Sequence, residues 1–348
     1  MKKNFFLLAY LVFTFVSCTK TDECINCNES QTIDSKSTDT SSLQERRLST
    51  QGYLKYNNVM FKGSHNSYER RESIEEQLNY SNPIHQNNVL ALEFDVWRNT
   101  PKNYNRTNIP SNTWVVNHWP HPGKRGRTLA SYFSQLKNWH TKVKNHVPVM
   151  IKLDIKSSNG GYQNFHEQID WYLSRFLGDD IIFSSREMFK DPNRSLRHNM
   201  LYNEAWPTID QLRGKFIIVL TGNDSFIDQY SKFLHNRRTA FAMKKQNIGK
   251  TDDVSSGIWH ANNTINNNPN YIFYNFSMSN IKDIKNRAGS KEFLKQMAKR
   301  GMITRVYSAN NRDDWNLCKS LKISCISTDK IRNHDWARID CCRILVKR

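Results

Sequence analysis

Strand-like and helix-like segments alternate along this chain, and this alternation narrows the possible folds more than any other feature. Apolar or β-branched runs of strand length are separated in several places by amphipathic stretches of helix length. The strand-like runs are Asn58–Lys62, Leu90–Val96, Trp114–Asn117, Val149–Ile155, Lys215–Thr221, Tyr271–Phe276, Met302–Ser308 and Ile323–Ser327. The helix-like stretches are Ser73–Tyr80, Leu129–Val143, Phe165–Leu177, Lys291–Arg300 and Arg312–Leu321. About eight strands with intervening helices in one domain predict a distorted TIM-type (β/α)8 barrel of the α/β class.

An open, doubly wound sheet is the alternative for such a pattern. That fold usually carries a glycine-rich phosphate loop after its first strand, and none follows Asn58–Lys62. Polar residues are also spread over the first four strand-like runs. A barrel would bring them into one pocket, because the carboxyl ends of its strands meet at one end, whereas an open sheet would not. We also expect Thr128 to cap the helix that begins at Leu129.

Residues 1–17 are predicted to be a signal peptide rather than part of the fold. Two lysines precede an apolar run that ends at Val16, and the small residue Ser17 stands directly before Cys18. This order resembles a bacterial lipobox, so we expect Cys18 to be lipidated and to anchor the protein in the bacterial cell envelope. The alternatives are an ordinary secretory signal and an uncleaved anchor, but the run is shorter than the roughly 20 residues of a membrane span.

The rest of the chain divides into a tether and one domain. Residues 18–47 are rich in Ser, Thr, Asp and Glu, have almost no large apolar side chains, and are predicted to be a flexible tether. Residues 48–348 contain no visible repeat or linker and are long enough for one large barrel. An exported location permits disulfides among the cysteines beyond Cys18, and the sequence leaves their pairing open.

The chain carries a formal net charge of +19 at pH 7. Such an excess of positive charge attracts anionic lipid headgroups, although it also suits a soluble basic protein. The lysines are scattered rather than clustered, and nucleic acid is a poor partner for an exported lipoprotein. We therefore expect a monomer whose partner is a membrane surface and not nucleic acid.

Six polar residues stand at or near the ends of the first four strand-like runs. They supply two imidazoles, one amide and three carboxylates, and they are His65, Asn66, Glu93, Asp95, His118 and Asp154. Because alternate residues of a strand share one face, Glu93 and Asp95 should point the same way. A hard cation beside an acid–base pair is suited to phosphoryl transfer. The order and spacing of these residues therefore predict that class of chemistry.

The carboxylates in this set predict a calcium site. Carboxylates in one pocket repel one another and raise one another's pKa values unless a cation compensates. Calcium accepts about six to eight oxygen ligands, and Asn66, Glu93, Asp95 and Asp154 with waters and a substrate oxygen would fill such a shell. Zinc is less suitable, because oxygen ligands dominate and the cysteines lie far away in sequence. Pairing of Glu93 or Asp95 with Arg98 is the alternative.

The chain resembles the phosphatidylinositol-specific phospholipase C superfamily, and within it the calcium-dependent bacterial branch. The matching motifs are Gly63–Tyr68, Leu92–Trp97, Val115–His118 and Pro148–Asp154, followed by looser agreement at Leu212–Lys215, Thr304–Val306 and Ile326–Asp329. The resemblance covers roughly Val59 to Asp329 and is looser after Lys156. It implies a distorted barrel with two catalytic histidines and a calcium ion.

Two positions distinguish the branches of this superfamily. In metal-independent members an Asp follows the first histidine and an Arg occupies the position of Asp95. Here these positions hold Asn66 and Asp95, which is the calcium pattern. Asp154 departs from the pattern, because calcium-dependent members carry Glu at that position, and the shorter side chain could weaken this ligand or route it through water.

The resemblance also implies a reaction on lipids with an inositol headgroup. The inositol 2-hydroxyl would attack the adjacent phosphate and release diacylglycerol and an inositol cyclic phosphate. His65 would stabilise the phosphoryl oxygens, His118 would protonate the leaving group, and Glu93 or Asp154 would take the hydroxyl proton. His121 is the alternative to His118.

Lys152 and Arg305 would bind phosphate or inositol hydroxyls, or else pair with a ligand carboxylate. The substrate itself could be phosphatidylinositol, a phosphorylated form or a glycosyl-phosphatidylinositol anchor, and the sequence leaves this choice open.

Two other functions remain as alternatives. Glycerophosphodiester phosphodiesterases use a related barrel, but they normally open with His-Arg-Gly and a Pro-Glu-Asn segment, and His65-Asn66-Ser67 matches neither. A non-catalytic lipoprotein that binds lipid or glycan is a different class. The complete acid–base and metal set argues against it.

Overall fold

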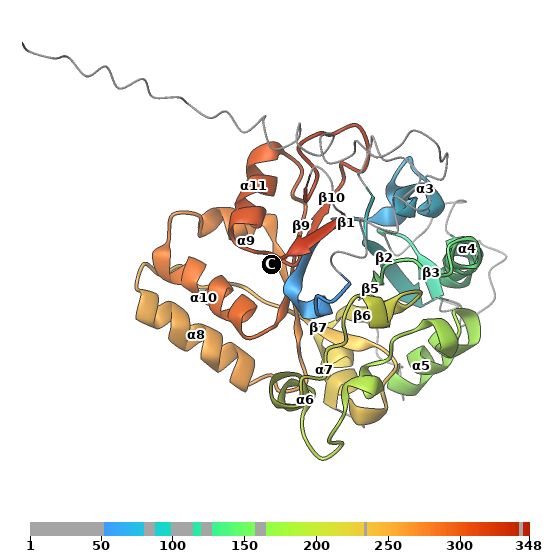
Figure 1. Ribbon diagram of the computed structural model, residues 1–348, viewed down its shortest axis with the longest axis horizontal. Helices are drawn as coiled ribbons and strands as arrows, with labels where there is room; N and C mark the ends of the chain where they lie inside the picture. Colours follow the sequence, from blue (N-terminus) through green and yellow to red (C-terminus); the bar gives the residue numbers. More distant parts are fainter. Residues whose placement is uncertain are drawn as a thin grey trace, which may run out of the picture. The chain divides into compact units, whose positions relative to one another are not determined.

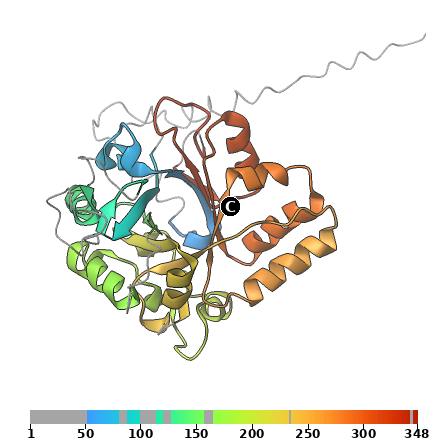
Figure 2. The same ribbon diagram turned by 180° about the vertical axis from the view of Figure 1, so that it is seen from behind.

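Eight parallel strands form a closed ring in the computed structural model, which describes residues 52–79, 88–98, 114–119, 127–156, 165–232, 235–340 and 344–348. In order around the ring they are β1 (Val59–Ser64), β2 (Ala91–Arg98), β5 (Val149–Ile155), β6 (Phe216–Gly222), β7 (Phe241–Lys245), β8 (Phe273–Ser277), β9 (Ile303–Tyr307) and β10 (Cys325–Thr328). Figures 1 and 2 show the helices arranged around this ring. The predicted (β/α)8 barrel is therefore confirmed.

The ring closes where β1 meets β2, through the residue pair Gly63–Ala91. A Cβ atom at Gly63 would lie 2.4 Å from Oγ of Ser327 and 2.9 Å from Sγ of Cys325, both on the neighbouring strand β10. Figure 1 shows β1 and β10 side by side although they come from opposite ends of the described chain. Glycine is required here because a larger side chain would collide with β10 at the closure.

Three further strands extend the sheet outside the ring. β11 (Leu345–Lys347) lies antiparallel to β1, β3 (Trp114–Val116) lies antiparallel to β2, and β4 (Arg127–Thr128) pairs with β3. β3 carries His118 just beyond its end, so this hairpin-like extension brings a histidine to the rim of the barrel.

The helices pack on the outside of the barrel (Figure 2). They are α3 (Ile74–Leu78), α4 (Leu129–Lys142), α5 (Phe165–Phe176), α6 (Leu196–Tyr202), α7 (Asp224–Lys232), α8 (Val254–Asn266), α9 (Met278–Asp283), α10 (Ala288–Lys299) and α11 (Arg312–Ser320). The predicted cap of α4 is confirmed, because the Thr128 side chain accepts a hydrogen bond from the backbone N–H of Ser131. Short 3₁₀ turns lie at Tyr56–Asn58, Ser67–Glu69, Asp179–Ile181, Ser185–Met188, Asp210–Leu212 and His235–Arg237.

All the predicted strand segments except Trp114–Asn117 belong to the ring. That segment forms β3, which lies outside the ring, so its prediction as a barrel strand is wrong. The missing ring strand is β7, in which the apolar Phe241, Ala242 and Met243 are followed by two lysines. So short an apolar run gives a weak strand signal, and the ring position of β7 is set by pairing with β6 and β8.

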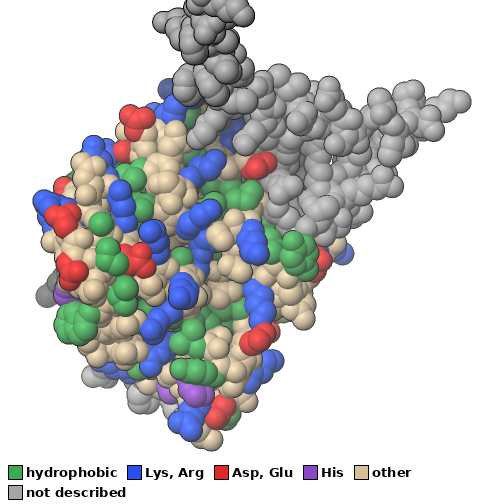
Figure 3. Space-filling model, turned by 60° about the vertical axis from the view of Figure 1, so that its left-hand side comes forward, with side chains coloured by type: hydrophobic (Ala, Val, Ile, Leu, Met, Phe, Trp, Pro, Cys, Tyr) green, Lys and Arg blue, Asp and Glu red, His purple; other side chains and the backbone are tan. Residues whose placement is uncertain are grey.

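Several predictions fall on residues outside the described ranges. These are the signal peptide at residues 1–17, the tether at 18–47, the lipid anchor at Cys18 and the alternative histidine His121. Of the cysteines that the structure describes, Cys318 and Cys325 are buried free thiols. No helix within the described ranges is long and apolar enough to cross a membrane. Lys and Arg side chains are spread across the face shown in Figure 3, as their scatter in the sequence predicts.

Candidate active site

The register between β2 and β5 places the predicted carboxylates in two adjoining layers. Glu93 lies opposite Lys152, and Asp95 lies opposite Asp154, two residues nearer the carboxyl ends of the strands. All four side chains are buried, and contacts among them show that they share the interior face. Strand periodicity and register together therefore place the predicted carboxylates in one cluster, at the end of the barrel where such folds carry their active sites.

Glu93, Asp95 and Asp154 have the geometry of a metal site. Each offers one carboxylate oxygen, and these three atoms all lie within 4.8 Å of one another. Calcium–oxygen distances are about 2.3–2.6 Å, so two ligands of one ion lie at most about 5 Å apart. Among the described residues, Oδ1 of Asp95 and Oδ1 of Asp154 are buried and have no hydrogen-bond partner. Orphaned buried oxygens in an all-oxygen cluster fit a hard cation such as calcium.

Glu93 differs from the other two carboxylates, because both of its oxygens are already paired. Lys152 Nζ donates to Oε1 at 2.6 Å, and Arg305 Nη2 donates to Oε2. Burial alone would raise the pKa of Glu93, but Arg305 and Lys152 hold this pKa well below its ordinary value. Lys152 and Arg305 thus pair with a predicted ligand carboxylate, which is the alternative that the sequence left open.

Lys156 is a second cation in the cluster and was not predicted as a site residue. Its Nζ lies 3.0 Å from Oδ2 of Asp154 and 3.4 Å from Oδ1 of Asp95. Burial lowers the pKa of Lys156, but Asp154 and Asp95 outweigh burial and raise it above its ordinary value. For the carboxyl group of Asp154, burial acts in the opposite direction and raises the pKa. Lys152 and Lys156 outweigh burial and hold the pKa of Asp154 below its ordinary value. Lys156 continues the i, i+2 pattern of Lys152 and Asp154, a signal that could have identified it.

His118 is held at the rim of the barrel by Asp95. Its Nδ1 lies 3.2 Å from Oδ2 of Asp95, and the Tyr68 hydroxyl donates to the same oxygen at 3.0 Å. Burial raises the pKa of Asp95, which Lys156 partly counteracts. The side chain of His118 is 43 % exposed, so the imidazole is supported on one side and open to solvent on the other. The adjacent Trp119 is 69 % exposed.

His65 is held by a carboxylate from a distant part of the sequence. Its Nδ1 lies 3.0 Å from Oδ1 of Asp329, which follows β10, and Arg70 Nη1 lies 3.0 Å from the same oxygen. The Tyr307 ring stacks on His65 with a centroid distance of 5.7 Å. Asp329 belongs to a motif noted in the sequence, but only the β1–β10 pairing shows that it contacts His65.

Asn66 contacts the carboxylate cluster through its backbone N–H group. It adopts the left-handed conformation with φ of 46°, and its N–H donates to Oε2 of Glu93 at 3.5 Å. Its side-chain Nδ2 donates to Glu69 at 3.3 Å. The structure therefore brings Asn66 to the cluster, and its role as a metal ligand stays a prediction.

Comparisons with known proteins agree with this geometry. Residues 124–272 match the family described as phosphoinositide phospholipase C, Ca2+-dependent. A calcium-dependent phosphoinositol-specific phospholipase C from a Pseudomonas species aligns with a TM-score of 0.59 and 17 % identity, over 86 % of this chain and 96 % of that chain. A Ca2+-dependent phosphatidylinositol-specific phospholipase C from Streptomyces antibioticus aligns with a TM-score of 0.57 and 15 % identity, over 85 % and 99 % of the two chains. A search of curated proteins found no match.

Residues 124–272 of this chain are therefore similar to a calcium-dependent phosphoinositide phospholipase C family, and the aligned solved structures share its barrel fold. The resemblance stated from the motifs is thereby confirmed, and these similarities indicate a phosphodiesterase enzyme. The aligned solved structures support the fold alone, and the family match concerns residues 124–272.

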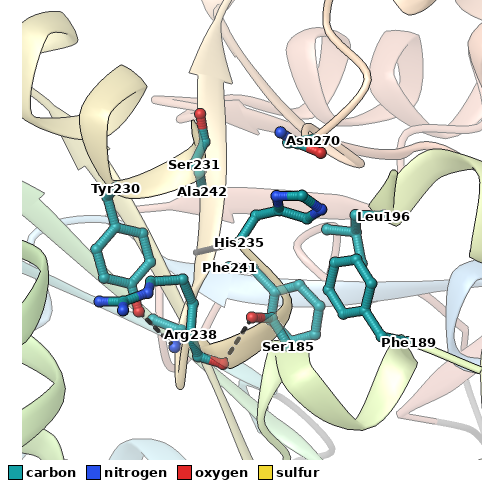
Figure 4. Close-up of a pocket in the computed structure, with 11 residues that line it drawn as sticks. Ser185, Phe189, Leu196, Tyr230, Ser231, His235, Arg238, Phe241, Ala242 and Asn270 are labelled. Atoms are coloured by element: carbon teal, nitrogen blue, oxygen red, sulfur yellow. Dashed lines mark hydrogen bonds between the residues drawn. The ribbon is translucent and has the colours of Figure 1, made fainter. Parts of the chain in front are cut away.

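A small cavity at the opposite end of the barrel is not part of this phospholipase C-like site. It adjoins the amino end of β7, and Figure 4 shows His235 and Asn270 among its lining residues. The Ser185 hydroxyl donates to the Arg238 carbonyl oxygen at 2.8 Å beside it. Among the described residues, Nε2 of His235 and Oδ1 of Asn270 are buried without a hydrogen-bond partner, an arrangement suited to a bound water.

Proposed function

We propose that this protein is a calcium-dependent phosphodiesterase that cleaves phosphatidylinositol-type lipids. The products are diacylglycerol and an inositol cyclic phosphate, formed by attack of the inositol 2-hydroxyl on the neighbouring phosphate. The observation that carries the proposal is the pair of buried Oδ1 atoms of Asp95 and Asp154, which accept no hydrogen bond from the described residues and lie in one carboxylate cluster. Two histidines with carboxylate partners adjoin the same cluster.

Asn66, Glu93, Asp95 and Asp154 are the residues that would hold calcium. When bound, calcium lowers the pKa of the attacking hydroxyl and offsets the negative charge that develops on the phosphate. Lys152 and Arg305 keep Glu93 ionised and fixed in place. In this proposal Glu93 or Asp154 accepts the proton of the attacking hydroxyl.

The two histidines have separate tasks in this proposal. Asp95 faces Nδ1 of His118, which leaves the other ring nitrogen directed away from the carboxylate and toward the leaving group. Asp329 faces Nδ1 of His65 in the same way, so Nε2 of His65 is left to donate a hydrogen bond to a phosphoryl oxygen. His118 therefore protonates the diacylglycerol oxygen as it leaves, and His65 stabilises the charged phosphate.

A membrane surface as the place of reaction is also part of the proposal. It is supported by the exposed indole of Trp119 next to His118 and by the net charge of +19, because Trp and basic residues favour anionic membrane interfaces. The proposed anchoring in the bacterial cell envelope at Cys18 is supported by the order of residues in the first 18 positions. We propose that the anchored protein acts as a monomer on phosphatidylinositol, its phosphorylated forms or a glycosyl-phosphatidylinositol.

Phosphorus NMR of the products tests this function. Purified protein is incubated with phosphatidylinositol vesicles, with calcium or with excess chelator. An inositol cyclic phosphate signal that appears only with calcium is expected. Formation of a linear phosphate as the first product, or identical rates under both conditions, would contradict the proposal.

A further inference from the structure

Lys156 occupies a special position relative to the proposed metal ligands. Its ammonium group lies between the carboxylates of Asp95 and Asp154, at 3.4 Å and 3.0 Å from one oxygen of each. The Asp95 atom that it approaches is Oδ1, one of the two buried oxygens without a hydrogen bond. Lys156 therefore forms an ion pair with one of these two oxygens, Oδ1 of Asp95, and donates a hydrogen bond to the other carboxylate through Oδ2 of Asp154.

The other cations of the cluster pair mainly with Glu93, although Lys152 also donates to Oδ2 of Asp154 at 3.3 Å. Lys152 is buried with only 1 % of its side chain exposed, and its shortest contact is with Glu93. Arg305 is equally buried and also pairs with Glu93. Lys156 is the cation that contacts both Asp95 and Asp154. Its positive charge offsets the repulsion between these two neighbouring carboxylates.

Lys156 is also able to leave this position. It follows the last residue of β5, and 28 % of its side chain is exposed, in contrast to the enclosed Lys152. Its four-carbon side chain and terminal ammonium can rotate into solvent without moving the strand. A divalent ion placed between the same two carboxylates would repel an ammonium about 3–4 Å away, so the two cations exclude each other.

We propose that Lys156 is a tethered cation that fills the calcium position in the metal-free protein and must be displaced when calcium binds. This inference rests on the proposed function, because it assumes that calcium binds at Asp95 and Asp154. Lys156 then has two effects: it stabilises the empty site, and it weakens calcium binding. The protein consequently responds to a higher calcium concentration than its carboxylates alone would require.

Calcium titration calorimetry of Lys156→Met tests the inference without measuring activity. Methionine keeps the length of the side chain and removes its charge, so the Kd for calcium should fall by roughly tenfold or more. In chelator, the same variant should melt at a lower temperature than the wild type, because its carboxylates have lost their counter-ion. Lys156→Arg keeps the positive charge and should bind calcium about as weakly as the wild type.

Lys142→Met is the matched control, because this exposed lysine pairs with Glu75 on the outside of the barrel. It should leave the Kd for calcium unchanged. Lys156→Gln is prepared in parallel, so that poor folding of the methionine variant, seen by circular dichroism, does not remove the test.

The outcomes separate the inference from the function on which it rests. If the wild type binds calcium and both neutral variants bind it equally well or more weakly, the role of Lys156 is overturned and the calcium site stands. If neither the wild type nor the variants bind calcium, the calcium requirement fails and the competition fails with it. Binding that appears only in the neutral variants would support the inference.

Discussion

Oδ1 of Asp329 lies 3.0 Å from Nδ1 of His65. Asp329, which follows β10, therefore positions the imidazole of His65, which follows β1. Asp329→Asn should lower kcat by roughly tenfold and leave KM nearly unchanged, since the amide keeps the shape but loses the charge that orients the ring. Steady-state kinetics measure the effects on kcat and KM separately. Asp329→Glu should restore part of kcat, and an equal effect on KM would argue for general disruption instead.

Replacing either proposed catalytic histidine should nearly abolish turnover without unfolding the protein. His65→Ala and His118→Ala should each lower kcat by about 10²–10⁴-fold, the usual effect of removing a general acid–base group. His198→Ala on α6 serves as the control and should be close to wild type. Circular dichroism checks the fold. Normal turnover of His118→Ala would show that another histidine, such as His121, is the general acid.

Removal of calcium should stop the reaction and weaken the fold. A metal that binds only the native state stabilises it by mass action, so excess chelator should lower the melting temperature as well as turnover. Magnesium should restore little activity, because it prefers strict octahedral geometry and retains its waters. Thermal denaturation and product assays in matched buffers provide the test, and full turnover in chelator would refute the metal assignment.

Lys62 should make stability rise with pH above neutrality. Burial, followed by the charge of Arg338, lowers the pKa of Lys62 to about 7, and its Nζ donates to the Ile331 carbonyl oxygen at 2.9 Å. Between about pH 7 and pH 10 the unfolded chain holds the Lys62 proton and the native state does not. The free energy of unfolding should therefore increase through this window, by at most about 1.4 kcal/mol per pH unit for one group.

Denaturant unfolding of Lys62→Met at pH 6.5, 8 and 9.5 isolates this contribution. The variant should exceed the wild type in stability most at pH 6.5, and the difference should shrink as the pH rises. Lys142→Met controls for the loss of an exposed charge. Parallel curves for the wild type and Lys62→Met would contradict the low pKa.

The inositol 2-hydroxyl should be indispensable in the substrate. A 2-O-methyl or 2-deoxy inositol phospholipid should be inert even where it binds, because an intramolecular nucleophile has a large effective-concentration advantage over water. Competition binding and phosphate release measure the two properties separately. Efficient hydrolysis of glycerophosphocholine together with the blocked lipid would instead assign the protein to the glycerophosphodiesterases.

The sequence predicts the ring and the carboxylate cluster well, because both depend on local periodicity. Glu93 and Asp95 share a face by alternation, and the continuous apolar run that contains Asp154 marks β5 almost to the residue. The sequence pattern did not show that β7, and not β3, belongs to the ring. Pairing with the neighbouring strands β6 and β8 places Phe241–Lys245 there, and the apolar content of this segment is too small to indicate it.

Contacts between distant segments account for most of what the sequence does not show. The pairing of Arg305 with Glu93 joins residues 212 positions apart, and that of His65 with Asp329 joins residues 264 apart. Both depend on the closed ring, and no spacing rule within one segment encodes them. Lys156 is the exception, because its position two residues beyond Asp154 was visible in the strand pattern.

The closure of the ring at Gly63 links the order of synthesis to the assembly of the site. β1 is made early, yet its partners β10 and β11 are built from Cys325–Thr328 and Leu345–Lys347. A nascent chain that has not reached Cys325 has an open sheet edge and no Asp329 beside His65. A chain that ends before β10 would therefore lack the carboxylate that holds His65 in the candidate active site.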